Sequence, residues 1–170
     1  MEMKRKQIRN ISLLIGLTAV AGAYFLGFIP IVIGSTADVC NHKDFIKEGV
    51  LNPLSDLNDS DKFEIYLWMS YDDMYSNNRL LNGKVFKCDD QEVLKSMKPH
   101  LKLKSTDADL ATTNSRIYIY RNTKLVFSSS IHLEKNHFGF QSSDFGWIEK
   151  NELLPYLKKF KKVYAPVVFL

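Results

Sequence analysis

Four histidines are the side chains of this sequence best suited to proton transfer or metal binding. They are His42, His100, His132 and His137. A structural zinc site usually shows closely spaced pairs of His or Cys ligands, whereas these histidines are scattered and Cys40 with His42 supplies at most half a site. The sequence therefore predicts no metal site and no cofactor.

Three consecutive serines, residues 128–130, stand just before His132 and are the nearest approach to a nucleophile beside a base. Successive strand residues point to opposite faces, and residues two apart are too distant to share the hydrogen bond that such a pair requires. The chain also has no G-x-S-x-G motif and no glycine-rich phosphate loop. We therefore predict that the protein is not an enzyme.

The two cysteines, Cys40 and Cys88, form an isolated pair. In an oxidising compartment such a pair is usually bridged, and closing a loop of roughly 49 residues is worth about 4 kcal/mol on the chain-entropy model. We predict a disulfide between them. Two free thiols, or pairing with another chain, remain open alternatives.

A basic cluster and an aromatic group are the candidate contacts for a partner protein. The basic residues are Lys158, Lys159, Lys161 and Lys162, placed on the expected last helix. Trp147 belongs to a group of aromatic residues for which core packing is the competing explanation. We take the four lysines and Trp147 as candidate partner-binding residues.

The elements that position these residues begin with an apolar N-terminal run. Residues 11–33 contain no charged side chain, and a helix of that length, at about 1.5 Å per residue, crosses a hydrocarbon core of about 30 Å. The run follows four Lys and Arg residues within the first ten, and cations at such a flank stay in the cytoplasm. Cleavage after Ala37, where small residues precede, is the alternative.

This pattern predicts a single-pass protein of the bacterial inner membrane. Residues 1–10 form a cytoplasmic tail, residues 11–34 a transmembrane signal anchor in contact with the lipid bilayer, and residues 38–170 a periplasmic globular domain. Outside the first ten residues the chain has 19 Lys and Arg against 18 Asp and Glu. Because this remainder is nearly neutral, we expect no nucleic-acid partner.

The remaining pattern predicts an α+β domain. Residues 116–142 contain three β-rich segments separated by turns, which indicates a three-stranded antiparallel meander at the centre of a sheet. Residues 63–69 alternate as in a further strand. Capping residues and helical spacing indicate two or three short helices, one beginning after Asp89 or Asp90 and one near Leu154.

In its layout the chain resembles the small single-pass accessory proteins of membrane-bound transcription regulators, those of the ToxS kind and the PsaF and MyfF proteins. The matching features are residues 1–10, the apolar run 11–33 and an exported domain with cysteines. The resemblance implies a sensory or accessory subunit that stabilises or modulates a regulator. It also makes His42, His100, His132 and His137 candidate pH sensors, since imidazole titrates near neutral pH.

A periplasmic immunity protein that neutralises a secreted toxin is the alternative function. Its contact surface would be the acidic loop Asp56–Asp61 or the lysines near Lys158. The acidic loop begins like a calcium loop, but Asp61 stands where glycine is needed and Leu67 where glutamate is needed. We therefore expect no calcium there.

Overall fold

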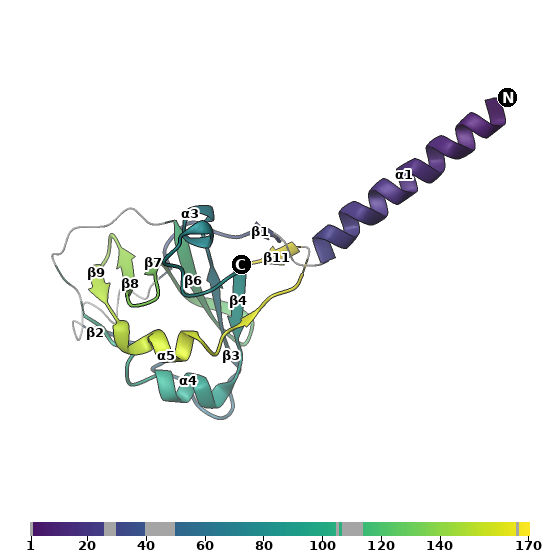
Figure 1. Cartoon of the computed structure of the whole chain (residues 1–170). Helices are drawn as coiled ribbons and strands as arrows, with labels where there is room; N and C mark the ends of the chain where they lie inside the picture. Colours follow the sequence, from purple (N-terminus) through teal and green to yellow (C-terminus); the bar gives the residue numbers. More distant parts are fainter. Residues whose placement is uncertain (1, 26–29, 40–49, 105, 107–113, 166) are drawn as a thin grey trace. The chain divides into compact units, whose positions relative to one another are not determined.

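The structure is a computed structural model that describes residues 2–25, 30–39, 50–104, 106, 114–165 and 167–170 (Figure 1). The described chain divides into two units. One consists of Met1–Ile33 with Tyr164–Phe169, and the other of Gly34–Val163 with Leu170. The second unit contains most of the residues predicted to be functional.

A seven-stranded antiparallel sheet is the main element of the larger unit (Figure 1). Its strands, in spatial order, are β10 (Lys161–Lys162), β4 (Val85–Cys88), β3 (Phe63–Trp68), β6 (Ser115–Arg121), β7 (Lys124–Leu133), β8 (Phe138–Ser142) and β9 (Gly146–Glu149). A separate antiparallel pair joins β2 (Val50–Leu51) to β5 (Leu103–Lys104). The short helices are α3 (Tyr71–Tyr75), α4 (Gln91–Met97), η1 (Asn151–Leu153) and α5 (Leu154–Leu157).

The alternation of side chains along the strands gives the sheet one apolar face. In β3, Phe63, Ile65 and Leu67 are buried whereas the residues between them are only partly buried. The apolar face packs against Leu94 of α4 and Leu157 of α5 in a single hydrophobic core. Because burying one such side chain stabilises the fold by about 1.5–3 kcal/mol, this alternation fixes which face of each strand points inward.

Turn and cap residues set the ends of these elements. The β6–β7 hairpin turns through Asn122 and Thr123, whose φ angles of 49° and 68° lie in the left-handed region, as a tight hairpin requires. Asn122 also accepts a hydrogen bond from the backbone of Lys62 at 2.9 Å. At α4, the carboxylate of Asp90 accepts from the amides of Glu92 and Val93 and so caps the helix.

The predicted α+β fold is wrong, because the larger unit is mostly sheet with only a few short helices. The three-stranded antiparallel meander predicted for residues 116–142 is present, because β6, β7 and β8 are consecutive antiparallel neighbours in the seven-stranded sheet. Strands β4, β9 and β10 have four, four and two residues. Strands this short leave little periodicity in the sequence.

The smaller unit contains a helix and a short parallel strand pair. The helix is α1 (Glu2–Phe25), and β1 (Ile31–Ile33) pairs in parallel with β11 (Val167–Phe169). The apolar residues 167–169 near the C-terminus thus pair as a strand. Val168 is buried in this pair, whereas Phe169 is exposed.

The prediction of one transmembrane helix over residues 11–34 is wrong. Helix α1 begins within the charged segment and ends at Phe25, so its apolar part, 11–25, is about 22 Å long, which is short of the roughly 30 Å of a hydrocarbon core. Residues 31–33 of the predicted span form β1. No helix within the described residues has the length and apolarity to span a bilayer. The predictions of a signal anchor and of a single-pass inner-membrane location depended on this helix, and they are wrong for the same reason.

Candidate functional site

The side chains opposite the core form a polar face on the sheet. In an antiparallel sheet, directly paired residues share a face. One such row runs across five strands through the pairs Trp68↔Arg116, Arg116↔Ser130, Ser130↔Gln141 and Gln141↔Trp147. The polar face therefore brings together residues from distant parts of the chain.

The structure gathers three of the predicted site residues at the β9 end of this face. We call His132, His137 and Trp147 the His–Trp cluster. The His132 and His137 rings lie 5.4 Å apart between centroids, and the His132 ring meets Trp147 edge-on at 6.1 Å. The His137 ring is stacked on Trp147, with centroids 5.7 Å apart and planes 17° apart. Two candidate pH sensors and one candidate partner contact thus form a single surface.

Gly139 allows Trp147 to take this position. A Cβ atom at residue 139 would lie 2.3 Å from two ring carbons of Trp147, a distance that no side chain tolerates. Gly139 also pairs with His132 on one side and Glu149 on the other. The indole therefore occupies the space above a strand glycine, where a missing side chain permits close approach.

A carboxylate faces each histidine of the cluster. His132 Nε2 lies 3.4 Å from Glu134, and His137 Nδ1 lies 3.1 Å from Glu149. Asn78 donates to Glu134, and Asn151 donates to Glu149, which holds both carboxylates in place. When an imidazole takes up a proton, its contact with the carboxylate becomes an ion pair. Protonation therefore changes the charge of this surface without requiring a rearrangement.

The other predicted histidine and cysteine residues lie elsewhere. The ring of His100 is 5.7 Å from that of Tyr156 and so contacts α5. Cys88 is buried in β4, and burial raises the pKa of its thiol group. Cys40 and His42 lie outside the described residues, so the disulfide and the role of His42 stay predictions. Among the described residues, no group of three or more His, Cys, Asp or Glu side chains is placed to hold a metal ion.

The four candidate lysines do not lie on a helix. Helix α5 ends at Leu157, so Lys158 and Lys159 are exposed beyond it. Lys161 and Lys162 form β10, the short edge strand that pairs with β4. Lysines on a short edge strand also discourage pairing with another chain. We call these four residues the lysine segment.

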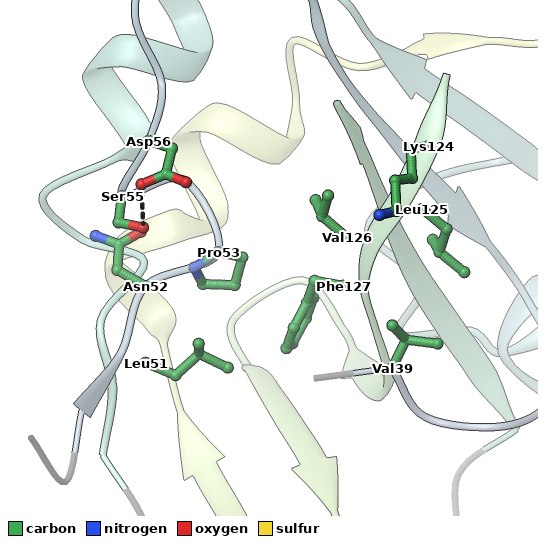
Figure 2. A pocket seen from close by; sticks show the side chains of 10 residues that line it. All are labelled: Val39, Leu51, Asn52, Pro53, Ser55, Asp56, Lys124, Leu125, Val126 and Phe127. Carbon is green, nitrogen blue, oxygen red and sulfur yellow. Dashed lines mark hydrogen bonds between the residues drawn. The ribbon is translucent and has the colours of Figure 1, made fainter. Parts of the chain in front are cut away.

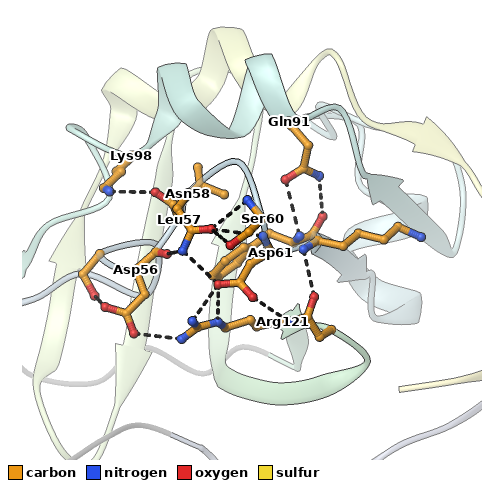
Figure 3. A network of polar contacts seen from close by, with 12 residues as sticks. Asp56, Leu57, Asn58, Ser60, Asp61, Gln91, Lys98 and Arg121 are labelled. Atoms are coloured by element: carbon orange, nitrogen blue, oxygen red, sulfur yellow. Dashed lines mark hydrogen bonds and ion pairs between the residues drawn. The ribbon is translucent and has the colours of Figure 1, made fainter.

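The acidic loop Asp56–Asp61 is tied to the sheet by Arg121 (Figure 3). The Arg121 guanidinium lies 2.6 Å from Asp61 and 3.0 Å from Asp56. Hydrogen bonds from Arg121, and then from Asn122 and Asn58, hold the pKa of the Asp61 carboxyl below its ordinary value. Asn58 also closes the loop by accepting from the amides of Ser60 and Asp61. These carboxylates are thus engaged within the chain itself.

A cavity of about 350 Å³ lies between this loop and β7. Figure 2 shows Leu51, Asn52, Pro53, Ser55 and Asp56 on one side, and Val39 with residues 124–127 on the other. The charged groups of its lining are Asp56 and Lys124. Asp56 pairs with Arg121, so one of these two charged groups is already engaged within the chain.

Two charged residues that the sequence patterns did not single out are buried in the sheet. Lys84 is 5% exposed, and its Nζ lies 3.6 Å from the ring centre of Tyr71 and 5.6 Å from that of Trp68. Burial lowers the pKa of this ammonium group. Arg116 is 6% exposed and pairs with Asp38 at 2.6 Å. The local sequence does not predict that Lys84 or Arg116 is buried, because the residues that cover them come from other segments of the chain.

Comparison with known proteins gives no relative to guide the assignment: no family model, no curated protein and no solved structure matches this chain.

Proposed function

We propose that this chain is a non-enzymatic binding protein that contacts a partner protein through the His–Trp cluster and modulates its activity. The observation that carries the proposal is the stacking of the partly exposed Trp147 on His137, beside His132. Tryptophan is among the residues that contribute most to protein interfaces. Two histidines against it make the contact sensitive to pH.

The direction of the pH effect follows from the carboxylates. With both imidazoles neutral, Glu134 and Glu149 leave the surface with two uncompensated negative charges. With both imidazoles protonated, each carboxylate has an ion-pair partner at 3.4 Å or less. Covering an unpaired charge costs more than covering a hydrogen-bonded pair. Binding to a partner should therefore strengthen as the pH falls and the imidazoles gain protons.

Capture from the native cells at two pH values tests this function. The tagged full-length chain is crosslinked at pH 7.5 and 5.5, and the partners are identified by mass spectrometry. We expect one partner whose recovery rises about tenfold at the lower pH, which corresponds to an average uptake of roughly half a proton on binding over these two pH units. A transcription regulator is the partner that the resemblance in layout implies, whereas a secreted toxin would support the immunity function.

Matched histidine variants decide whether the cluster is responsible. The double variant His132→Gln with His137→Gln should capture equal amounts at both pH values, because glutamine carries no titrating charge. His100→Gln, which changes a histidine outside the cluster, should keep the wild-type response. A double variant with the full pH response, or the absence of any specific partner, would contradict the proposal.

A further inference from the structure

Residues 35–39 lie against the sheet at β6 and β7, and we call this segment the strap. β8 pairs with β7 only from Ser130 to Leu133, which leaves the edge of β7 at Ser128 to the strap. Val39 forms an antiparallel bridge with Ser128 there. The Val39 amide donates to the Ser128 carbonyl at 3.1 Å, and the Ser128 amide donates to the Val39 carbonyl at 2.8 Å. This end of the strap therefore pairs with β7 as a neighbouring strand does.

Two hydroxyl groups of the sheet hold the main chain of the strap. The Tyr118 hydroxyl donates to the Ser35 carbonyl at 3.0 Å. The Ser128 hydroxyl donates to the Ala37 carbonyl, also at 3.0 Å. At the start of the strap, the Ser35 amide donates to the carbonyl of Leu170 at 3.3 Å. Because main-chain carbonyls are present in every residue, a segment of another sequence in the same conformation would form the same contacts.

Arg116 contacts a side chain of the strap as well as its main chain. The guanidinium donates to the Asp38 carboxylate at 2.6 Å and to the Ala37 carbonyl at 3.1 Å. Arg116 is only 6% exposed, and a buried charge that loses its partner is strongly destabilising. A segment bound at this surface must therefore supply a carboxylate opposite Arg116.

The sheet side of the contact is buried, whereas most of the strap is exposed. Tyr118 and Ser128 are each 1% exposed, while residues 35–37 are exposed and no residue of the strap belongs to the hydrophobic core. Burial of apolar surface is the dominant favourable term in folding. Because the strap contributes little of it, polar contacts hold the strap in place, and a competing segment that makes the same contacts can displace it.

We propose that this surface is a peptide-binding site that the strap occupies as an internal ligand, and that an acidic segment of another protein replaces the strap. Pairing of a peptide with the open edge of a strand is a common mode of recognition, and the edge at Ser128 provides it. The positive charge of Arg116 selects an aspartate or glutamate in the incoming segment. The surface shares no residue with the His–Trp cluster, so the strap keeps a second binding site closed.

Amide hydrogen exchange of the ¹⁵N-labelled full chain, followed by NMR, tests whether the strap leaves the sheet. The Ser128 amide donates to the strap, whereas the Met69 amide donates to the Lys84 carbonyl at 2.8 Å. The protection factor of Ser128 should be at least about tenfold lower than that of Met69, because the strap opens without unfolding of the sheet. Equal protection would show that the strap leaves only when the domain unfolds, and would overturn the proposal.

Calorimetric titration with the peptide acetyl-Gly-Ser-Thr-Ala-Asp-Val-amide, which has the sequence of residues 34–39, tests recognition. The Asp38→Ala chain lacks the strap's own carboxylate, so it should bind this peptide at least about tenfold more tightly than the wild type, whose strap competes. The same peptide with asparagine in place of aspartate should bind the variant at least about tenfold more weakly. Equal affinities for the two peptides, or no binding of the aspartate peptide, would refute the proposal.

Thermal unfolding with and without the peptide shows whether the peptide replaces the strap in the folded chain. The unfolding midpoint of Asp38→Ala should lie below that of the wild type and should rise when the aspartate peptide is added, because a ligand stabilises the state that binds it. Asp72→Ala removes an exposed aspartate of α3 and should bind the peptide no better than the wild type. A midpoint of Asp38→Ala that the peptide leaves unchanged would contradict the proposal.

Discussion

Replacing Phe140 with alanine should lower the free energy of unfolding by about 3–5 kcal/mol. Phe140 is fully buried in β8. Its ring meets those of Phe138 and Phe127 edge-on, with centroid distances of 5.0 Å and 6.3 Å. The variant loses both the transfer free energy of the ring and the packing around it. Because a domain of this size is stable by only about 5–15 kcal/mol, this loss is a substantial part of the total stability.

Denaturant unfolding followed by circular dichroism measures this loss. Phe169→Ala is the matched control, since Phe169 is 74% exposed in β11 and should cost no more than about 0.5 kcal/mol. Phe140→Leu, which keeps an apolar side chain, should fall between the two. A loss below about 1 kcal/mol for Phe140→Ala would show that β8 does not pack into the core as described.

Replacing Trp147 with alanine should weaken the partner complex about 100-fold, as expected for a tryptophan at the centre of an interface. The variant removes the indole stacked on His137 and exposes the strand backbone at Gly139. Affinity for the captured partner is measured by surface plasmon resonance at pH 5.5. An unchanged affinity would place the interface elsewhere.

A second variant tests whether a loss of binding results from a change in the fold. Trp147→Phe keeps an aromatic ring over Gly139 and should retain binding within about tenfold. Tyr75→Ala removes an exposed aromatic side chain from α3 and should have no effect on the affinity. A structural role for Trp147 would be indicated by two results together. Trp147→Ala would lose binding and also have a lowered unfolding midpoint, and Trp147→Phe would lose binding completely.

Local patterns in the sequence predicted the positions of some helices and strands but not the full order of the strands in the sheet. The alternation at residues 63–69 indicates a strand, and β3 occupies Phe63–Trp68. Asp90 is a cap signal, and α4 begins immediately after it. Both depend on neighbouring residues only. The size of the sheet depends on β10 pairing with β4 and on β9 pairing with β8, and a strand as short as β10 leaves no periodicity from which to predict the pairing.

The apolar N-terminal run shows how composition misled the prediction. A run of 23 uncharged residues satisfies the length rule for a membrane helix. That rule assumes one continuous helix, whereas the helix ends at Phe25 and residues 31–33 pair with β11. Pro30 lies just before this strand and has no amide hydrogen to continue a helix.

The sequence predicted individual residues of the candidate site but not that they lie together. His132, His137 and Trp147 were singled out from the sequence for different reasons, and only the pairing of β7, β8 and β9 places them together. Arg116 and Gln141 were not singled out at all. Whether a buried polar atom has a partner is a property of the folded chain, and neither residue type nor spacing reports it.

Site-specific photocrosslinking tests most directly the claim that the partner docks on the His–Trp cluster. Benzoylphenylalanine is placed at Lys135, an exposed turn residue between His132 and His137, or at Lys158 in the lysine segment. Illumination in the native cells at pH 5.5 should crosslink the partner from position 135 and not from position 158. Crosslinking from position 158 alone would contradict the account and place the interface on the lysine segment.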